Sequence, residues 1–152
     1  MIKIVYGNIF DQDVDALVNP VNIVGVMGAG LAKQFKIRYS DMFNWYKQEC
    51  ENGQFSIGEI LYYFSPEDKK WIINFPTKKH WKDKSTLEYI EEGLKGLCVD
   101  LVFEKNIEIN SIAIPALGCG LGGLNWNDVK KLIYEYLSNV DFDVIMVLEN
   151  KR

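Results

Sequence analysis

Strand-like and helix-like patterns alternate along the whole chain, and this alternation limits the folds that the sequence can adopt. Runs of β-branched and aromatic residues lie between turn signals, and amphipathic stretches of helical period separate them. Such alternation predicts an α/β fold. We expect strands at residues 2–6, 16–19, 59–64, 71–75, 111–114 and 144–148, and helices at about 28–38, 41–52, 86–105 and 126–138.

Two local patterns refine this prediction. The segment EILYYFSPEDKKWIINF, residues 59–75, predicts a β-hairpin, because two aromatic-rich runs flank a turn that contains proline and acidic residues. The sheet is therefore expected to be mixed. The sequence STLE at residues 85–88 predicts a capping box at the start of a helix. Its apolar face is expected to contain Leu87, Ile90, Leu94, Leu97, Leu101 and Val102.

Length and composition favour one domain, residues 1–152, because 48% hydrophobic content is enough for a single core. The N-terminus reads as a strand, and no run of about 18 apolar residues follows, so we expect a soluble cytoplasmic protein without a membrane segment. The three cysteines, Cys50, Cys98 and Cys119, are widely spaced and form no CxxC motif. Neither a disulfide framework nor a metal site is expected.

The charge distribution bears on nucleic-acid binding. A net charge of -4 argues against a protein that binds nucleic acid mainly by neutralising many phosphates. A basic patch is nevertheless present, since KKHWKDK at residues 78–84 follows the lysines at 69–70 and encloses Trp81. This patch is either a solvated loop or a local nucleic-acid contact.

Two glycine-rich loops stand out. NPVNIVGVMGAGLAKQFK, residues 19–36, and PALGCGLGGLNW, residues 115–126, each follow an apolar strand and precede a helix. Glycines let backbone N–H groups approach a ligand closely, and a helix N-terminus adds partial positive charge, so such loops favour phosphate. Because neither segment contains lysine or arginine in its glycine-rich part, ahead of Lys33 in the first and throughout the second, we expect a diphosphate held between them by backbone amides.

Two other interpretations of the second loop stay open. Gly118, Gly120 and Gly123 satisfy GxGxxG, which would indicate a dinucleotide-binding domain, but Pro115 follows the strand directly and little chain remains for the rest of such a domain. Alternatively, the glycines only make tight turns. No GxxxxGK[ST] motif is present, so a P-loop is not expected.

Four segments in this order, GNIF, DALVNPVNIVGVMGAGLAKQFK, NFPTKKHW and IPALGCGLGGLNW, resemble a macrodomain over almost the whole chain. Within that superfamily the chain looks most similar to the DNA ADP-ribosyl glycohydrolases of DarT–DarG toxin–antitoxin systems, and more distantly to the human terminal ADP-ribose protein glycohydrolase. The resemblance implies a three-layer α/β/α fold with a mixed, mostly parallel sheet. It also implies a cleft that binds ADP-ribose at the C-terminal ends of the strands.

By this resemblance, the loop from Asn22 to Gly30 wraps the distal ribose and one phosphate. Asn19 would support that loop, and Asn22 would hydrogen-bond the distal ribose or the linked base; both could instead be turn-forming residues. Asn8 stands where relatives carry an acidic residue for adenine, so the contact would use its amide oxygen or the Ile9 backbone. The expected ADP-ribose contacts are Asn8, Ile9, Asn19, Asn22, Val26, Met27, Gly28, Ala29, Gly30, Leu31, Thr77, Leu117, Gly118, Cys119, Gly120, Leu121 and Gly122.

The resemblance also implies a catalytic lysine. Thr77-Lys78 matches a TK motif whose lysine attacks the anomeric carbon of ADP-ribose, or traps the opened aldehyde as a Schiff base. The ammonium must first lose its proton, which an apolar, desolvated setting favours. Lys78, with Asn22 beside the ribose, is the expected catalytic set; Lys79 is the fallback, and Lys78 could instead be an exposed member of the basic loop.

Gly122 departs from the human relative, which has an aspartate there that is proposed to assist the lysine. The DNA-directed branch also reads GG at this point, so proton transfer is left without an assigned group. His80 could move protons near neutral pH, whereas Cys119 is expected to be part of the loop structure. Trp81 could stack on a base of single-stranded DNA, or could be a core or lid aromatic. The expected DNA contacts are Lys79, His80, Trp81 and Lys82, with Lys84 near the phosphates.

The resemblance therefore implies an enzyme that needs no cofactor or metal. It would bind ADP-ribose and remove it from DNA, with thymine as the expected modified base, and so reverse the action of a DNA ADP-ribosyltransferase toxin. A DarT-like toxin is an expected partner. Two alternatives stay open. The enzyme could act on ADP-ribosylated glutamate or on small ADP-ribosyl compounds, or the chain could be a non-catalytic ADP-ribose-binding module.

Overall fold

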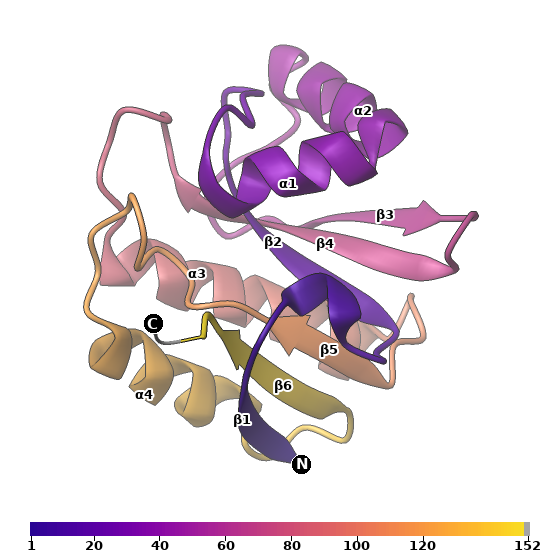
Figure 1. The fold of residues 1–152 in the computed structure, drawn as a ribbon, viewed down its shortest axis with the longest axis vertical. Coiled ribbons are helices and arrows are strands. Elements are labelled where there is room, and N and C mark those ends of the chain that lie inside the picture. The colour runs from indigo at the N-terminus through magenta and orange to yellow at the C-terminus, as the bar shows by residue number, and fades with distance from the viewer. Residues whose placement is uncertain (151–152) are drawn as a thin grey trace.

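A six-stranded sheet forms the centre of the molecule in the computed structural model, which describes residues 1–150 (Figure 1). The strand order is β1-β6-β5-β2-β4-β3, and every neighbouring pair is parallel except the antiparallel pair β3–β4. The predicted mixed, mostly parallel sheet and its hairpin are confirmed. The strands are β1 (Ile2–Tyr6), β2 (Ala16–Asn22), β3 (Leu61–Ser65), β4 (Lys70–Lys78), β5 (Ser111–Ile114) and β6 (Asp143–Leu148).

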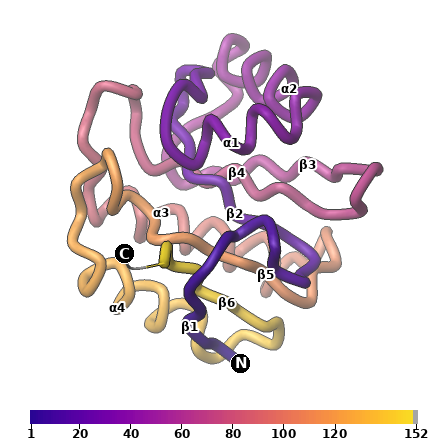
Figure 2. The backbone as a smooth tube through the Cα atoms, viewed as in Figure 1, coloured from indigo at the N-terminus to yellow at the C-terminus, as the bar shows by residue number. Residues whose placement is uncertain are grey.

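Helices cover both faces of this sheet. α1 (Gly30–Arg38) and α2 (Ser40–Glu51) lie on one side, and α3 (Leu87–Cys98) and α4 (Trp126–Leu137) lie on the other (Figures 1 and 2). This arrangement confirms the predicted three-layer α/β/α fold. No helix in residues 1–150 is long and apolar enough to cross a membrane.

The alternation of side chains along β2 divides the core into two halves. Leu17 and Val21 pack with the residues of α1 and α2, whereas Ala16 and Val18 pack with α3 and α4. All four are buried. A strand buried on both faces reads as a continuous apolar run, which is what the segment ALV presents before the first asparagine.

The strands that carry the cleft are longer than predicted. β2 continues past Pro20 to Asn22, and β4 continues past Pro76 to Lys78. A proline normally interrupts a central strand because it has no N–H to donate. Here β5 pairs with β2 only at Ala16 and Leu17, and β3 pairs with β4 only as far as Asn74, so each proline lies where one edge of its strand is open.

The helix predicted at 86–105 differs at both ends. Thr86, not Ser85, caps α3, and its hydroxyl accepts a hydrogen bond from the Tyr89 backbone N–H at 3.2 Å. After Cys98 the chain continues as a π-helical segment, η2 (Val99–Glu104). The cap therefore lies one residue later than the STLE pattern predicted, and Ser85 is buried against the second glycine loop.

Candidate active site

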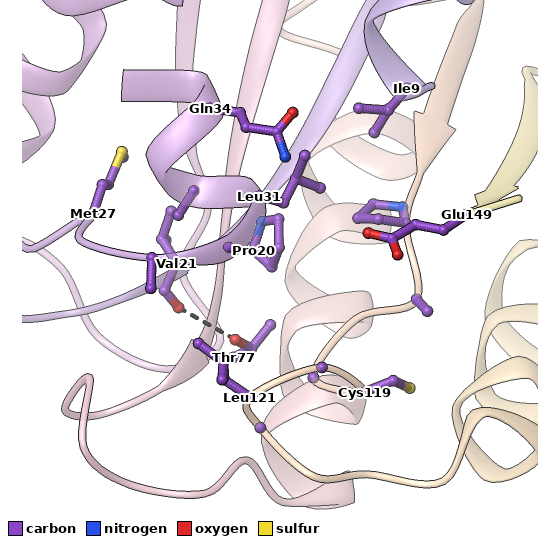
Figure 3. A pocket seen from close by; sticks show the side chains of 18 of the residues that line it. Ile9, Pro20, Val21, Met27, Leu31, Gln34, Thr77, Cys119, Leu121 and Glu149 are labelled. Atoms are coloured by element: carbon purple, nitrogen blue, oxygen red, sulfur yellow. Dashed lines mark hydrogen bonds between the residues drawn. The ribbon is translucent and has the colours of Figure 1, made fainter. Parts of the chain in front are cut away.

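A cleft of about 1390 Å³ runs along the C-terminal ends of the parallel strands. Its lining begins at the residues that follow β1 and β6, crosses the ends of β5 and β2, and reaches Lys78 at the end of β4. These ends span four strand spacings, or about 19 Å. Figure 3 shows Ile9 and Glu149 at one end of the cleft and Thr77 and Leu121 at the other. The shape suits an elongated ligand.

The first glycine loop, residues 23–29, is held by one buried asparagine. The Nδ2 of Asn22 donates to the Val26 carbonyl at 2.8 Å, and its Oδ1 accepts from the backbone N–H groups of Val24 at 3.1 Å and Val26 at 3.4 Å. The hydroxyl of Tyr46, on α2, lies 2.8 Å from both the Oδ1 and the backbone carbonyl of Asn22. Asn22 lines the cleft, yet most of its hydrogen-bonding capacity is spent on the loop.

At the end of this loop, α1 begins with free amides. Ala29 is the N-cap residue and offers no side-chain hydrogen bond. The first N–H groups of a helix have no partner within the helix, so those of Gly30, Leu31 and Ala32, all in the cleft lining, are available to a ligand. A diphosphate is the kind of group that such amides hold.

The second glycine loop, residues 117–123, is held by backbone contacts. The Leu124 N–H donates to the Gly118 carbonyl at 2.9 Å, and the Ser85 N–H donates to the Gly122 carbonyl at 3.0 Å. Gly118 has φ +71, a left-handed conformation that favours glycine. The N-terminus of the following helix, α4, does not offer its amides to a ligand in the cleft. Asn125 caps α4, and neither Asn125 nor Trp126 lines the cleft.

The position of Gly122 leaves no room for a side chain. A Cβ at this residue would lie 2.4 Å from the Ser85 Oγ and 2.5 Å from the Gly118 carbonyl oxygen. An aspartate at this position therefore does not fit without movement of the loop. Ser85 fills the space instead.

A β-bulge places Lys78 beside Asn22. Val21 pairs with Pro76, but the next residue, Asn22, pairs with Lys78, so Thr77 is the extra residue in β4. Bulges redirect side chains near active sites. The Thr77 hydroxyl donates to the Val21 carbonyl at 3.4 Å, as Figure 3 shows, and this contact joins the two strand ends.

The setting of Lys78 makes its ammonium easier to deprotonate than that of a free lysine. Its side chain lines the cleft, and its Nζ lies 3.4 Å from the Trp81 carbonyl. Burial lowers the pKa of Lys78, the positive charge of Lys84 lowers it further, and Asp83 acts in the opposite direction. Lys79 is placed differently, with its Nζ 5.7 Å from the centre of the Tyr89 ring and outside the cleft lining.

The aromatic residue of the basic loop reaches the cleft. Trp81 is 50% exposed and belongs to the lining. The His80 ring lies 5.3 Å from the Trp81 ring, and the Lys82 Nζ lies 5.0 Å from its centre. Trp81 is therefore not a core residue, and a face of cationic and aromatic groups continues outward from Lys78.

Most of the expected ligand residues line this cleft. Asn19 and Leu117 do not line it, and the side chain of Asn8 lines it but is engaged in a helix cap. Asn19 is fully buried, and its Nδ2 contacts the Asn74 Oδ1 at 3.1 Å and the Met27 Sδ at 3.8 Å, beneath the first loop. Leu117 is also fully buried and does not line the cleft. The Asn8 Oδ1 accepts from the Phe10 N–H at 2.9 Å, where it caps η1 (Ile9–Asp11). The expected contacts in the lining are Asn8, Ile9, Asn22, Val26, Met27, Gly28, Ala29, Gly30, Leu31, Thr77, Lys78, Trp81, Gly118, Cys119, Gly120, Leu121 and Gly122.

Polar residues that were not predicted also line the cleft, among them Gln34 and Glu149. Gln34 lies on α1 one turn after Gly30, so helical spacing could have indicated it. Glu149 is the first residue after β6, and the rule that ligands bind beyond the C-terminal ends of parallel strands could have indicated it. Both point toward the cleft in Figure 3.

The cysteine in the second loop has an unreactive setting. The Cys119 Sγ lies 3.5 Å from the Leu117 carbonyl, and burial raises the pKa of this thiol to about 11. The thiolate is the nucleophilic form, so Cys119 is a poor nucleophile near neutral pH. Within residues 1–150, no group of three or more histidine, cysteine or acidic side chains is arranged to hold a metal ion.

The three-layer fold carries a cleft between two amide-rich loops, and this cleft suits an elongated, phosphate-containing ligand. The chain belongs to the Macro domain family, which matches it over residues 18–133.

Individual relatives make the likeness more specific. The chain is 44% identical over 151 residues to a DNA ADP-ribosyl glycohydrolase of Thermus aquaticus, a match that covers 98% of this chain and 41% of the relative. Its fold matches the macrodomain of Mycobacterium tuberculosis DarG with a TM-score of 0.90, at 43% identity and 97% coverage of both chains. It also matches Thermosipho africanus DarTG in complex with ADP-ribose, with a TM-score of 0.89 at 35% identity, over 97% of this chain and 41% of that one. The chain thus spans about two fifths of the length of the full-length relatives that it matches.

Proposed function

We propose that this protein is an ADP-ribosyl glycohydrolase that removes ADP-ribose from DNA, with thymine as the modified base. One observation carries the proposal: Lys78 lies beside Asn22 at one end of the cleft, in a setting that lowers the pKa of its ammonium. The likeness to DNA ADP-ribosyl glycohydrolases at 44% identity and to DarTG with bound ADP-ribose supports the choice of reaction and ligand.

In the proposed complex, ADP-ribose lies along the cleft with adenine near Asn8 and Ile9. The free amides of Gly30 and Leu31 and the backbone of the second loop hold the diphosphate between them. The other lining glycines, Gly28, Gly118, Gly120 and Gly122, allow the backbone to approach the ligand. Val26, Met27, Ala29, Thr77, Cys119 and Leu121 complete the contacts, while Asn19 and Leu117 support the two loops from below.

The proposed reaction has two stages. The neutral amine of Lys78 forms a bond to the anomeric carbon of the distal ribose, and the bond from that carbon to the base breaks. The base takes the electron pair of the broken bond and the proton that the lysine nitrogen loses. Water then replaces the lysine on the ribose, which releases ADP-ribose and restores the amine. Asn22 keeps the first loop closed around the ribose and has one N–H left to donate to it.

The DNA strand is proposed to leave the cleft over the basic loop. Trp81 offers a half-exposed ring on which an unpaired base can stack. His80 and Lys82 lie beside that ring, and Lys79 of the same loop lies over Tyr89; we propose all three as phosphate contacts. This local patch provides for DNA binding in a chain of net charge -4.

The proposal also includes the biological setting. The enzyme would reverse the action of a DarT-like DNA ADP-ribosyltransferase toxin, and a complex with that toxin is part of the proposal. DNA modified by such a toxin lies inside the cell, so the proposed location is the cytoplasm.

The test is release of ADP-ribose from a single-stranded oligonucleotide ADP-ribosylated on thymine. We expect release by the wild type, and loss of at least about a thousandfold in rate for Lys78→Ala with ADP-ribose binding retained, since the nucleophile is removed. Lys131→Ala, an exposed lysine on α4, is the matched control and should behave as the wild type.

Three outcomes would redirect the assignment. Release from ADP-ribosylated glutamate but not from DNA would indicate the protein-directed enzyme. Binding of ADP-ribose without release from any substrate would indicate a non-catalytic module. Full activity of Lys78→Ala would remove this lysine from the mechanism.

A further inference from the structure

The order of the strand ends along the cleft divides its lining into three regions. Lys78, at the end of β4, lies at one extreme, and Glu149, which follows β6, lies toward the other. Between them are the ends of β2 and β5, which lead into the two glycine loops. Three strand spacings, or about 14 Å, separate the ends of β4 and β6. A ligand with its diphosphate between the loops and its distal ribose at Lys78 therefore places its nucleoside near Glu149.

The sheet fixes the backbone just before Glu149. Leu148, the last residue of β6, pairs with the end of β1, and its carbonyl accepts a hydrogen bond from the Gly7 N–H at 2.9 Å. This contact brings Glu149 next to the segment that leads to Ile9. The side chain of Glu149 is exposed and points into the cleft, at the end that Ile9 marks in Figure 3.

The groups around this end suit a nucleobase. Ile9 and Pro115, which directly follows β5, belong to the lining and offer apolar surface to a planar ring. The Asn8 Oδ1 already accepts a hydrogen bond from the Phe10 N–H, so part of its capacity is used within the fold. The exocyclic amine of adenine has two N–H groups to donate, and Glu149 supplies two further acceptor oxygens.

Glu149 also differs in charge from the other residues of the cleft. Among the described residues that line it, Glu149 carries the one carboxylate and Lys78 the one ammonium. An ionised carboxylate accepts hydrogen bonds and cannot donate them. It can therefore distinguish two bases by the group that faces it, because the amine of adenine donates, whereas the carbonyl oxygen at the same ring position of hypoxanthine is repelled.

We infer that the Glu149 carboxylate accepts a hydrogen bond from the exocyclic amine of adenine, and that Glu149 is thus a specificity-determining residue of this cleft. The inference rests on the proposed function, which supplies ADP-ribose as the ligand and sets its direction along the cleft. Glu149 follows a strand three places away from the one that carries Lys78. It therefore acts on the binding of the ligand and not on the bond that breaks.

The first experiment compares two ligands by isothermal titration calorimetry. Inosine diphosphate ribose carries hypoxanthine where ADP-ribose carries adenine, and is otherwise the same. We expect the wild type to bind ADP-ribose about tenfold more tightly, as a hydrogen bond to a charged acceptor predicts. Glu149→Gln should bind ADP-ribose about threefold to tenfold more weakly, and inosine diphosphate ribose as well as the wild type or better, because the glutamine amide can donate to the carbonyl oxygen.

The matched control is Glu135→Gln, which removes an exposed carboxylate from α4. It should keep the wild-type preference for ADP-ribose. Equal Tm values for Glu149→Gln and the wild type would show that the substitution leaves the fold intact.

The second experiment separates base recognition from catalysis. Single-turnover release of ADP-ribose from the thymine-modified oligonucleotide is measured at increasing protein concentration. Glu149→Gln should need about threefold to tenfold more protein for half of the maximal rate, and should reach the same maximal rate as the wild type. The reason is that adenine keeps the same contact before and during cleavage of the distant bond.

Three calorimetric results for Glu149→Gln would overturn the inference. Equal weakening for both ligands would assign the carboxylate to a group that they share, such as a ribose hydroxyl. Equal strengthening would mean that the carboxylate only repels the diphosphate. An unchanged preference for adenine would exclude Glu149 from base recognition.

Failure of the proposed function would look different. A wild type that binds ADP-ribose with the expected preference, but releases none from DNA, would overturn the proposed reaction and leave the role of Glu149 standing. A wild type that binds neither ligand would overturn both.

Discussion

The two loops that enclose the cleft are held in different ways. In the first loop, the side chains of Asn22 and Tyr46 provide the hydrogen bonds, and both are buried. In the second, backbone groups provide them, and the essential feature is the absence of side chains at Gly118 and Gly122. The first loop should therefore fail when a side chain is removed, and the second when one is added.

The two kinds of support also predict different responses to substitution in the two loops. A loop held by one asparagine loses several hydrogen bonds together when that residue is lost, so its opening should be cooperative. A loop packed against Ser85 has no single polar contact of that importance, but it has no room for a side chain at Gly118 or Gly122. Three substitutions test the contrast.

The largest loss of stability is expected for Asn22→Ala, about 3 kcal/mol, because three partly buried backbone groups of Val24 and Val26 lose their partner together. Urea denaturation would measure it, and hydrogen exchange should show faster opening of residues 23–29. Unchanged stability together with lost ADP-ribose binding would mean that Asn22 acts chiefly as a ligand contact.

A smaller loss, about 2 kcal/mol, is expected for Gly122→Ala, because the new Cβ would collide with the Ser85 Oγ and the Gly118 carbonyl oxygen. Gly120→Ala is the matched control in the same loop, since nothing lies within 4 Å of a Cβ at that residue. Thermal unfolding of both variants would check the prediction. Equal Tm values would show that the second loop accommodates a side chain at position 122. The double variant Ser85→Gly with Gly122→Ala should recover part of the loss.

The smallest loss, about 1 kcal/mol, is expected for Tyr46→Phe, which removes only the hydroxyl that contacts Asn22 and keeps the buried ring. Phe43→Leu, on the same helix and without a hydrogen bond to the loop, provides a packing comparison. Tyr46→Phe should speed hydrogen exchange in residues 23–29 without affecting residues 117–123. Faster exchange in both loops would contradict the independence of their supports.

The sequence could predict the elements of this fold because their signals are local. The hairpin at β3–β4, the apolar run of β2 and the glycine loops each depend on residues that are neighbours in the chain. The extension of β2 past Pro20 could not be predicted in this way, since a proline is tolerated there only because β5 has ended its pairing with β2.

The sequence predicts which residues belong to the candidate site better than it predicts what each of them does there. Lys78 and the glycines were found from motifs, but the sequence does not show that the Asn8 oxygen caps η1 or that Asn22 holds the first loop. The STLE pattern predicts that Ser85 caps a helix, but Ser85 is buried against Gly122 and Thr86 is the cap. Such assignments depend on partners that are distant in the sequence, which a local pattern does not contain.

The sequence by itself determined the alternation of strands and helices, the two amide-rich loops and the lysine that follows Thr77, because short-range periodicity and backbone freedom are properties of adjacent residues. The tertiary structure decided that Lys78 stands beside Asn22 and that Ser85 excludes a side chain at Gly122. Each of these depends on the register of parallel strands and on packing between segments far apart in the chain. That register is set by which side chains each strand buries, because a slip of one residue would turn every side chain to the opposite face.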